Sequence, residues 1–145
     1  MKKYRIYLDN CCFNRPYDDQ NYLFTQLETE AKLFVQRAIL LHKFELVWSY
    51  ILDYENAANP YQNRKQAIAK WRKIAKVDID ATETVINNAE KIMLKGIKQK
   101  DALHLACAIE AQCDYFLSTD KKLLKTTFDE IVTINPIDFI KILGI

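Results

Sequence analysis

Short apolar segments alternate with much longer amphipathic segments along this chain, and this order strongly constrains the fold. The segments with the aromatic and β-branched content of strands are residues 4–8, 45–48, 114–117 and 131–134. Helices are predicted over about residues 22–41, 50–58, 61–76, 82–94 and 101–112, with a short turn at 121–125 and a terminal helix after 135–136. Strands joined by helical crossovers form parallel sheets with helices on their faces. We therefore expect an α/β fold with a mostly parallel central sheet.

Capping and turn residues predict where the helices begin and end. Ser49 and Asn135-Pro136 are placed to start helices, and Gly96 is placed to stop one. Thr25 and Glu28 have the spacing of a capping box. Residues 10–20 are expected to form a loop. The helix over residues 22–41 is expected to bury an apolar face, whose members are Leu23, Leu27, Ala31, Phe34, Ala38 and Leu41.

The composition is that of a single globular domain spanning residues 1–145. Half of the residues are hydrophobic, and only 2 glycines and 3 prolines are present, which argues against linkers. We find no signal peptide and no apolar run of the roughly 18 residues that a membrane span needs, so we expect a cytoplasmic protein with no membrane contact. The 4 cysteines lack zinc-site spacing and are expected to be reduced, buried thiols.

Four acidic residues from distant parts of the chain are expected to meet at one edge of the sheet. Asp9 ends the first strand and Asp120 follows the third, while Glu55 lies in the helix after the second and Asp101 starts the helix leading into the third. Ligands bind outside the carboxyl ends of the strands in such sheets. Clustered carboxylates repel one another unless a cation neutralises them, which indicates a metal site. Asp9, Asp101 and Asp120 are each also explained as a turn or helix-cap residue.

Four segments, in this order, resemble the PIN domain family, which includes the VapC-type toxins of toxin–antitoxin pairs. The segments are YLDNCCFNRPYDD, SYILDYEN, KDALHLACAIEA and CDYFLSTDKKL. The resemblance spans nearly the whole chain and implies a three-layer PIN-like domain. It also implies a divalent-metal-dependent endoribonuclease that hydrolyses RNA phosphodiester bonds with Mg²⁺ or Mn²⁺. An antitoxin partner, if the protein is the toxin of a type II pair, and a homodimer are further implications.

The resemblance assigns the catalytic, metal-binding positions to Asp9, Glu55, Asp101 and Asp120. Asp53 is the alternative to Glu55, and the two would point to nearly opposite faces of their helix. Asn10 stands where many family members carry serine or threonine. Supporting roles are expected for Asn10, Ser118, Thr119 and His104, with a buried, hydrogen-bonded core histidine as the alternative for His104.

Basic residues near these segments are candidates for holding a nucleic acid, although the net charge of +2 is too small to indicate one. The candidates are Arg15, Lys65, Arg72, Lys73 and Lys76. An ordinary solvated helix face explains the last four equally well. A PIN-like module that binds RNA or protein without cutting is the alternative function. Retention of all four acids argues against it, because an idle carboxylate cluster only costs stability.

Overall fold

The computed structural model describes residues 3–144 and contains a sheet of five strands, all of them parallel to their neighbours. The order in the sheet is β3-β2-β1-β4-β5. The strands are β1 (Arg5–Leu8), β2 (Glu45–Ser49), β3 (Val77–Ile79), β4 (Tyr115–Leu117) and β5 (Val132–Ile134). The expected α/β fold with a parallel central sheet is confirmed.

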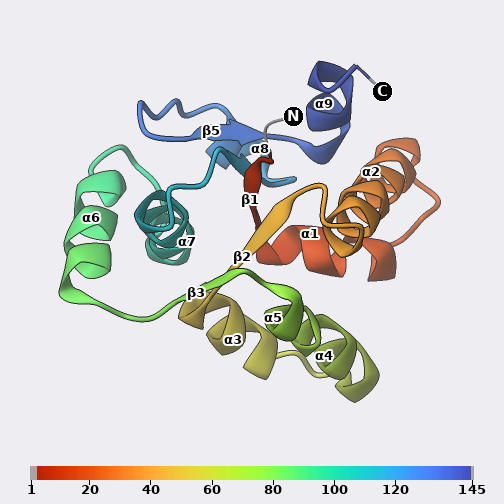
Figure 1. Ribbon diagram of the computed structural model, residues 1–145, viewed down its shortest axis with the longest axis horizontal. Helices are drawn as coiled ribbons and strands as arrows, with labels where there is room; N and C mark the ends of the chain where they lie inside the picture. Colours follow the sequence, from red (N-terminus) through yellow and green to blue (C-terminus); the bar gives the residue numbers. More distant parts are fainter. Residues whose placement is uncertain (1–2, 145) are drawn as a thin grey trace.

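Helices cover both faces of this sheet and complete a three-layer architecture (Figure 1). One side carries α6 (Glu83–Met93) and α7 (Gln99–Glu110), and the other carries α1 (Asn10–Asn14), α2 (Leu23–Leu40) and α9 (Pro136–Ile142). At the β3 end of the sheet lie α3 (Tyr50–Ala57), α4 (Gln62–Ala69) and α5 (Trp71–Ile74). The short elements are η1 (Arg15–Tyr17) and α8 (Lys121–Leu124).

The central strands are buried on both faces, which explains why their sequences are continuous runs of apolar residues. Ile6, Tyr7 and Leu8 of β1 are fully buried, as are Val47 and Trp48 of β2. Tyr7 stacks on Phe116 of β4 with ring centroids 5.1 Å apart. The described residues share this one core. No helix in this part of the chain is long and apolar enough to cross a membrane.

Several predicted helix boundaries are confirmed by their caps. Ser49 Oγ accepts a hydrogen bond from the Leu52 backbone at the start of α3, and the Asn135 side chain accepts one from the Ile137 backbone before α9. Gly96 follows α6 with φ +88°, a conformation that glycine adopts without a steric penalty.

Four local predictions are wrong. Residues 10–17 form α1 and η1 where a loop was expected, and residues 61–76 form two helices that part at Lys70. Strand β3 was missed because it has only three residues and its middle residue, Asp78, faces solvent. The capping box at Thr25 is absent, since α2 starts after Tyr22 without a side-chain cap.

The expected apolar face of α2 is only partly buried. Ala31 and Ala38 are buried, but Leu23, Phe34 and Leu41 are 66%, 36% and 59% exposed. The buried face is rotated and contains polar side chains, and its members are Glu28, Ala31, Lys32, Val35, Gln36, Ala38 and Ile39. The spacing of apolar residues alone does not identify the buried face of this helix. The elements that pack against α2 decide which face is covered.

The strand order creates a crevice at the carboxyl ends of β1 and β4. The chain moves from β1 to β2 on one side, and β4 lies on the other side of β1 and is followed by β5. Loops leaving β1 and β4 therefore diverge, which is where open α/β sheets bind ligands. Asp9 follows β1 at this crevice, and Ser118 follows β4.

Candidate metal centre

Asp9 is held in place at the end of β1 by backbone and side-chain hydrogen bonds. Its Oδ1 accepts from the Asn10 backbone at 2.8 Å, which makes Asp9 the N-cap of α1. Its Oδ2 accepts from Ser118 Oγ at 2.9 Å. The Asp120 backbone donates to the same Ser118 oxygen at 3.1 Å. Ser118 is fully buried and links the loops after β1 and β4 through these two bonds.

Glu55, and not Asp53, faces the crevice. Glu55 lines a cavity there together with Asp9. Asp53 instead accepts a 2.9 Å hydrogen bond from Trp48 Nε1 and pairs with Arg72 at 3.5 Å. The two acids therefore occupy different faces of α3, as their spacing predicted.

Asp101 and Asp120 complete the acidic lining of this cavity, whose volume is about 360 Å³. Asp101 lies in the first turn of α7, where Lys98 occupies the N-cap position without a side-chain cap, so the alternative explanation of Asp101 as the helix cap does not hold. Asp120 does cap a helix, because its Oδ1 accepts from the backbones of Lys122 and Leu123 at the start of α8. The structure thus brings all four predicted acids to one cavity.

Within the described chain, the negative charge in this cavity is not neutralised by ion pairs with lysine or arginine. Burial raises the pKa of Asp101, and the nearby carboxylates of Asp9, Asp120 and Glu55 raise it further against a smaller opposing effect of His104. The charged form of Asp101 therefore costs stability in the folded protein.

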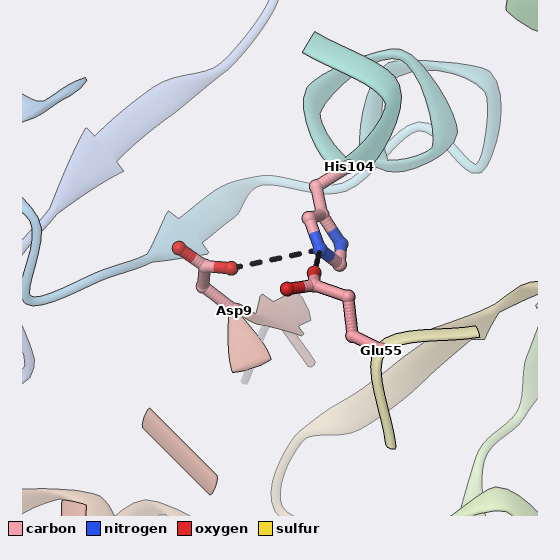
Figure 2. Close-up of side chains that lie close together, drawn as sticks. All are labelled: Asp9, Glu55 and His104. Carbon is pink, nitrogen blue, oxygen red and sulfur yellow. Dashed lines mark hydrogen bonds and ion pairs between the residues drawn. The ribbon is translucent and has the colours of Figure 1, made fainter. Parts of the chain in front are cut away.

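His104 reaches from α7 toward Asp9 at the end of β1 and Glu55 on α3 (Figure 2). Its Nε2 hydrogen-bonds Glu55 Oε1 and lies 3.8 Å from Asp9 Oδ1. On the other side of the ring, Nδ1 lies 2.6 Å from the Tyr7 hydroxyl, which lies 2.6 Å from Ser49 Oγ. His104 is 1% exposed, and its bond to Tyr7 is buried, whereas its bond to Glu55 lies at the wall of the cavity.

Tyr7 restricts where the protons lie in the series of hydrogen bonds from Ser49 through Tyr7 and His104 to Glu55. Burial raises the pKa of Tyr7 well above its ordinary value, so the phenol keeps its proton. When the phenol donates to Nδ1, the other ring nitrogen carries a hydrogen and donates it to Glu55. Asp9, Glu55 and His104 also present ligand atoms within 4.8 Å of one another, a spacing that a metal ion can bridge. His104 is thus either a donor that orients Glu55 or a ligand beside it.

The other supporting residues differ in their distance from the acids. Asn10 lines the cavity, whereas Thr119 lies in a neighbouring pocket and donates its backbone N–H to Cys11 Sγ at 3.4 Å. Cys11, Asn14 and Asp18 also line the cavity and were not anticipated. They belong to α1 and to the end of η1, the segment expected to be a loop, so helical spacing there would have found Asn14 one turn after Asn10.

The cysteines are all free, as expected. Cys12, Cys107 and Cys113 are buried, and burial raises the pKa of Cys107 to about 12. Cys11 is the exception to the expected burial, because it is partly exposed at the acid cavity.

None of the predicted substrate-binding residues lines the acid cavity. Arg15 pairs with Glu28 at 2.8 Å and Asp18 at 2.9 Å, and Arg72 pairs with Asp78 at 2.9 Å. Lys73 and Lys76 line a different pocket that includes Glu45, at the amino ends of the strands. Lys65 lies on α4, and its backbone carbonyl accepts from Asn56. The structure does not bring these five residues to the acids, and their substrate role stays a prediction.

Comparison with known proteins yields a likeness of fold. No family model matches the sequence, and no curated protein matches it. The fold is similar to that of a chain in the crystal structure of VapBC2 from Rickettsia felis bound to a DNA fragment from their promoter. The TM-score is 0.52 at 15% sequence identity, and the match covers 90% of this chain and 98% of that chain. At this identity the likeness establishes the PIN-like three-layer fold, and nothing beyond the fold.

The bonds around His104 predict that Tyr7 contributes strongly to stability. Tyr7→Phe should lower the free energy of unfolding by about 1–3 kcal/mol, because it leaves the buried Nδ1 of His104 without its partner. Urea unfolding followed by tryptophan fluorescence measures this change. Tyr22→Phe is the matched control, since Tyr22 is 68% exposed and should tolerate the loss of its hydroxyl. Equal stability of the two variants would contradict the arrangement.

Proposed function

We propose that this protein is a PIN-type endoribonuclease that hydrolyses RNA phosphodiester bonds and depends on a divalent metal ion. The observation that carries the proposal is the cavity at the carboxyl ends of β1 and β4, lined by Asp9, Glu55, Asp101 and Asp120. These acids come from four separate segments, and holding them together costs electrostatic energy that capping alone does not explain. The fold of a VapBC2 chain supports the same class of protein.

The donor set fits Mg²⁺ or Mn²⁺. Both ions favour carboxylate oxygens and retain water, so an open cavity with a few acids suits them better than an enclosed cage. Such an ion, when bound, supplies a Lewis acid that polarises the phosphate and favours deprotonation of the attacking water. The absence of basic ion-pair partners for the four acids, among residues 3–144, leaves their charge to be neutralised by cations.

The residues around the acids orient them for this task. Ser118 directs one oxygen of Asp9, and the Asn10 backbone directs the other. His104 donates to Glu55 and is itself oriented by Tyr7, so a chain of hydrogen bonds that starts in the core positions the carboxylate of Glu55 on α3. Supporting partners of this kind fix the direction of metal-binding carboxylates. We assign His104 to this orienting role because hard ions prefer oxygen to imidazole nitrogen.

A further cavity extends from the acids on the side of α7 and α8. It is lined by Asp101 and Asp120 together with Lys98 and Lys122. Both lysines are exposed, and a phosphate beside the acid centre would lie within their electrostatic reach. Lys98 and Lys122 are therefore better placed to hold the RNA backbone than the basic residues that sequence spacing favoured.

Metal-dependent cleavage is the direct test of the proposal. Purified protein should cleave single-stranded RNA with Mn²⁺ or Mg²⁺ and lose this activity in a chelator. Removing a residue that only supports a metal ligand costs about 10- to 100-fold, so Asp9→Asn and Asp101→Asn should cost at least as much. Asp129→Asn, in the exposed loop before β5, is the matched control. RNA binding without turnover under any divalent ion would favour the non-catalytic module instead.

Stability measured with and without metal gives an independent test. In chelator, Asp101→Asn should be more stable than the parent protein above the ordinary pKa of aspartate, because the raised pKa of Asp101 means that its charge opposes folding. With Mn²⁺ at roughly 100 times its Kd, the parent should gain about 2.7 kcal/mol and the variant much less. Thermal unfolding measures both effects. Equal stabilisation of both proteins by Mn²⁺ would place the ion elsewhere.

We extend the proposal to the toxin of a type II toxin–antitoxin pair, with a homodimer as its free form. Leu23 and Phe24, at the start of α2, are 66% and 73% exposed. Adjacent exposed apolar side chains are typical of protein interfaces, so they support a protein partner at the start of α2. Expression without an antitoxin should arrest the growth of a host cell, and Asp101→Asn should not. Light scattering should give twice the chain mass of 17.0 kDa. Unimpaired growth at high expression would exclude the toxin assignment.

A further inference from the structure

A second cavity of about 310 Å³ adjoins the acid cavity on the side of α3 and α4. The two cavities share Asn10, Asn14, Asp18 and Glu55 as lining residues, so they form one continuous depression. The second cavity differs chemically from the first. Away from the shared wall, its lining includes the aromatic side chain of Tyr61, the basic side chain of Arg64 and the amides of Asn56 and Asn59.

Arg64, which is half-buried, and the exposed Tyr61 lie against each other in this cavity. The guanidinium of Arg64 lies over the Tyr61 ring at 3.9 Å from its centroid and over the Tyr17 ring at 4.9 Å. Tyr61 is 53% exposed. Within the described chain Arg64 has no carboxylate partner, in contrast to Arg15 and Arg72, so its planar group is held by rings instead of by acids. Tyrosine rings and guanidinium planes are the groups on which unpaired nucleobases stack.

Amide groups supply hydrogen-bonding atoms around these two side chains. Asn14 Nδ2 donates to the backbone oxygen of Asn10 at 3.0 Å and to its Oδ1 at 3.3 Å, which fixes both side chains on the shared wall. Asn56 is 6% exposed and donates Nδ2 to the Lys65 carbonyl at 2.9 Å. Its Oδ1 is buried without a hydrogen-bond partner among the described residues. Asparagine amides match the donor and acceptor pattern of a base edge.

We infer that this second cavity binds one unpaired nucleobase of the RNA, next to the phosphate that enters the acid cavity. Tyr61 and Arg64 form the stacking surface, and the asparagine amides face the base edge. This inference rests on the proposed function, because the acid cavity is what places a phosphate beside it. It adds a specificity pocket to the nuclease, and it accounts for an exposed tyrosine and a half-buried arginine beside an acidic centre.

Fluorescence of 2-aminopurine tests the pocket, since stacking on an aromatic ring quenches this base. A six-nucleotide single-stranded RNA carries the analogue at each successive position, and every protein variant carries Asp101→Asn so that binding is measured without cleavage. One position should be quenched in the presence of Ca²⁺. Tyr61→Ala and Arg64→Ala should each abolish that quenching and weaken binding about 5- to 100-fold, the range for loss of one stacked base.

Matched controls separate stacking from general charge effects. Tyr22→Ala and Arg37→Ala remove an exposed ring and an exposed charge on the α2 side and should bind like the parent. RNA with an abasic site at the quenched position should bind Tyr61→Ala and the parent equally. The inference fails if no position is quenched, or if Tyr61→Ala weakens binding of the abasic RNA as much as that of the intact RNA.

The outcome does not depend on the cleavage assay. If the unsubstituted protein cleaves RNA but the Asp101→Asn protein shows no quenched position, the proposed nuclease stands and the base pocket does not. A protein that shows the quenched position but never cleaves would retain the pocket and lose the nuclease.

Discussion

Repulsion among four carboxylates is the constraint on which the rest of this structure depends. Asp9, Glu55, Asp101 and Asp120 line one cavity without a lysine or arginine partner in the described chain, and burial and neighbouring charge raise the pKa of Asp101. A fold keeps such a cluster only if rigid elements hold it. Here the elements are parallel strands whose carboxyl ends diverge, with helices that start or pass at the same edge. The loops after β1 and β4 and the helices α3 and α7 each contribute one of these acids to the cavity.

Two sets of polar contacts connect the buried core to the cavity. Ser118 joins the loops after β1 and β4 by bonding to Asp9 and to the Asp120 backbone. The chain from Ser49 through Tyr7 and His104 to Glu55 joins β2, β1, α7 and α3. Tyr7 also stacks on Phe116, so the same residue serves the apolar core and the polar chain. Buried networks of this kind define one arrangement of side chains, because a broken member leaves an unpaired polar group.

The two cavities that adjoin the acid cavity differ in the chemistry of their lining residues. On the α7 and α8 side, the adjoining cavity carries Lys98 and Lys122, which favour phosphate. On the α3 and α4 side, the adjoining cavity carries the ring of Tyr61, the guanidinium of Arg64 and several asparagine amides. Two of the basic residues predicted to hold substrate are paired with acids: Arg15 pairs with Glu28 and Asp18, and Arg72 pairs with Asp78. Free charge near the acids, and not total charge along a helix, distinguishes a surface suited to a nucleic acid from an ordinary helix face.

The sequence by itself determined the α/β class, four of the five strands and the four acids that share the cavity. Those features depend on local signals: apolar strands buried on both faces read as continuous runs, and acids that follow strands lie at one edge of a parallel sheet. Strand β3, the rotated buried face of α2 and the helix within residues 10–14 needed tertiary contacts, because their local patterns suit two structures equally. The fold alone decided the surroundings of His104 and the cavity at Tyr61 and Arg64, and it removed Asp53 as the alternative to Glu55. Each depends on contacts between side chains that are distant in the sequence, and the spacing of residues along the chain does not predict such contacts.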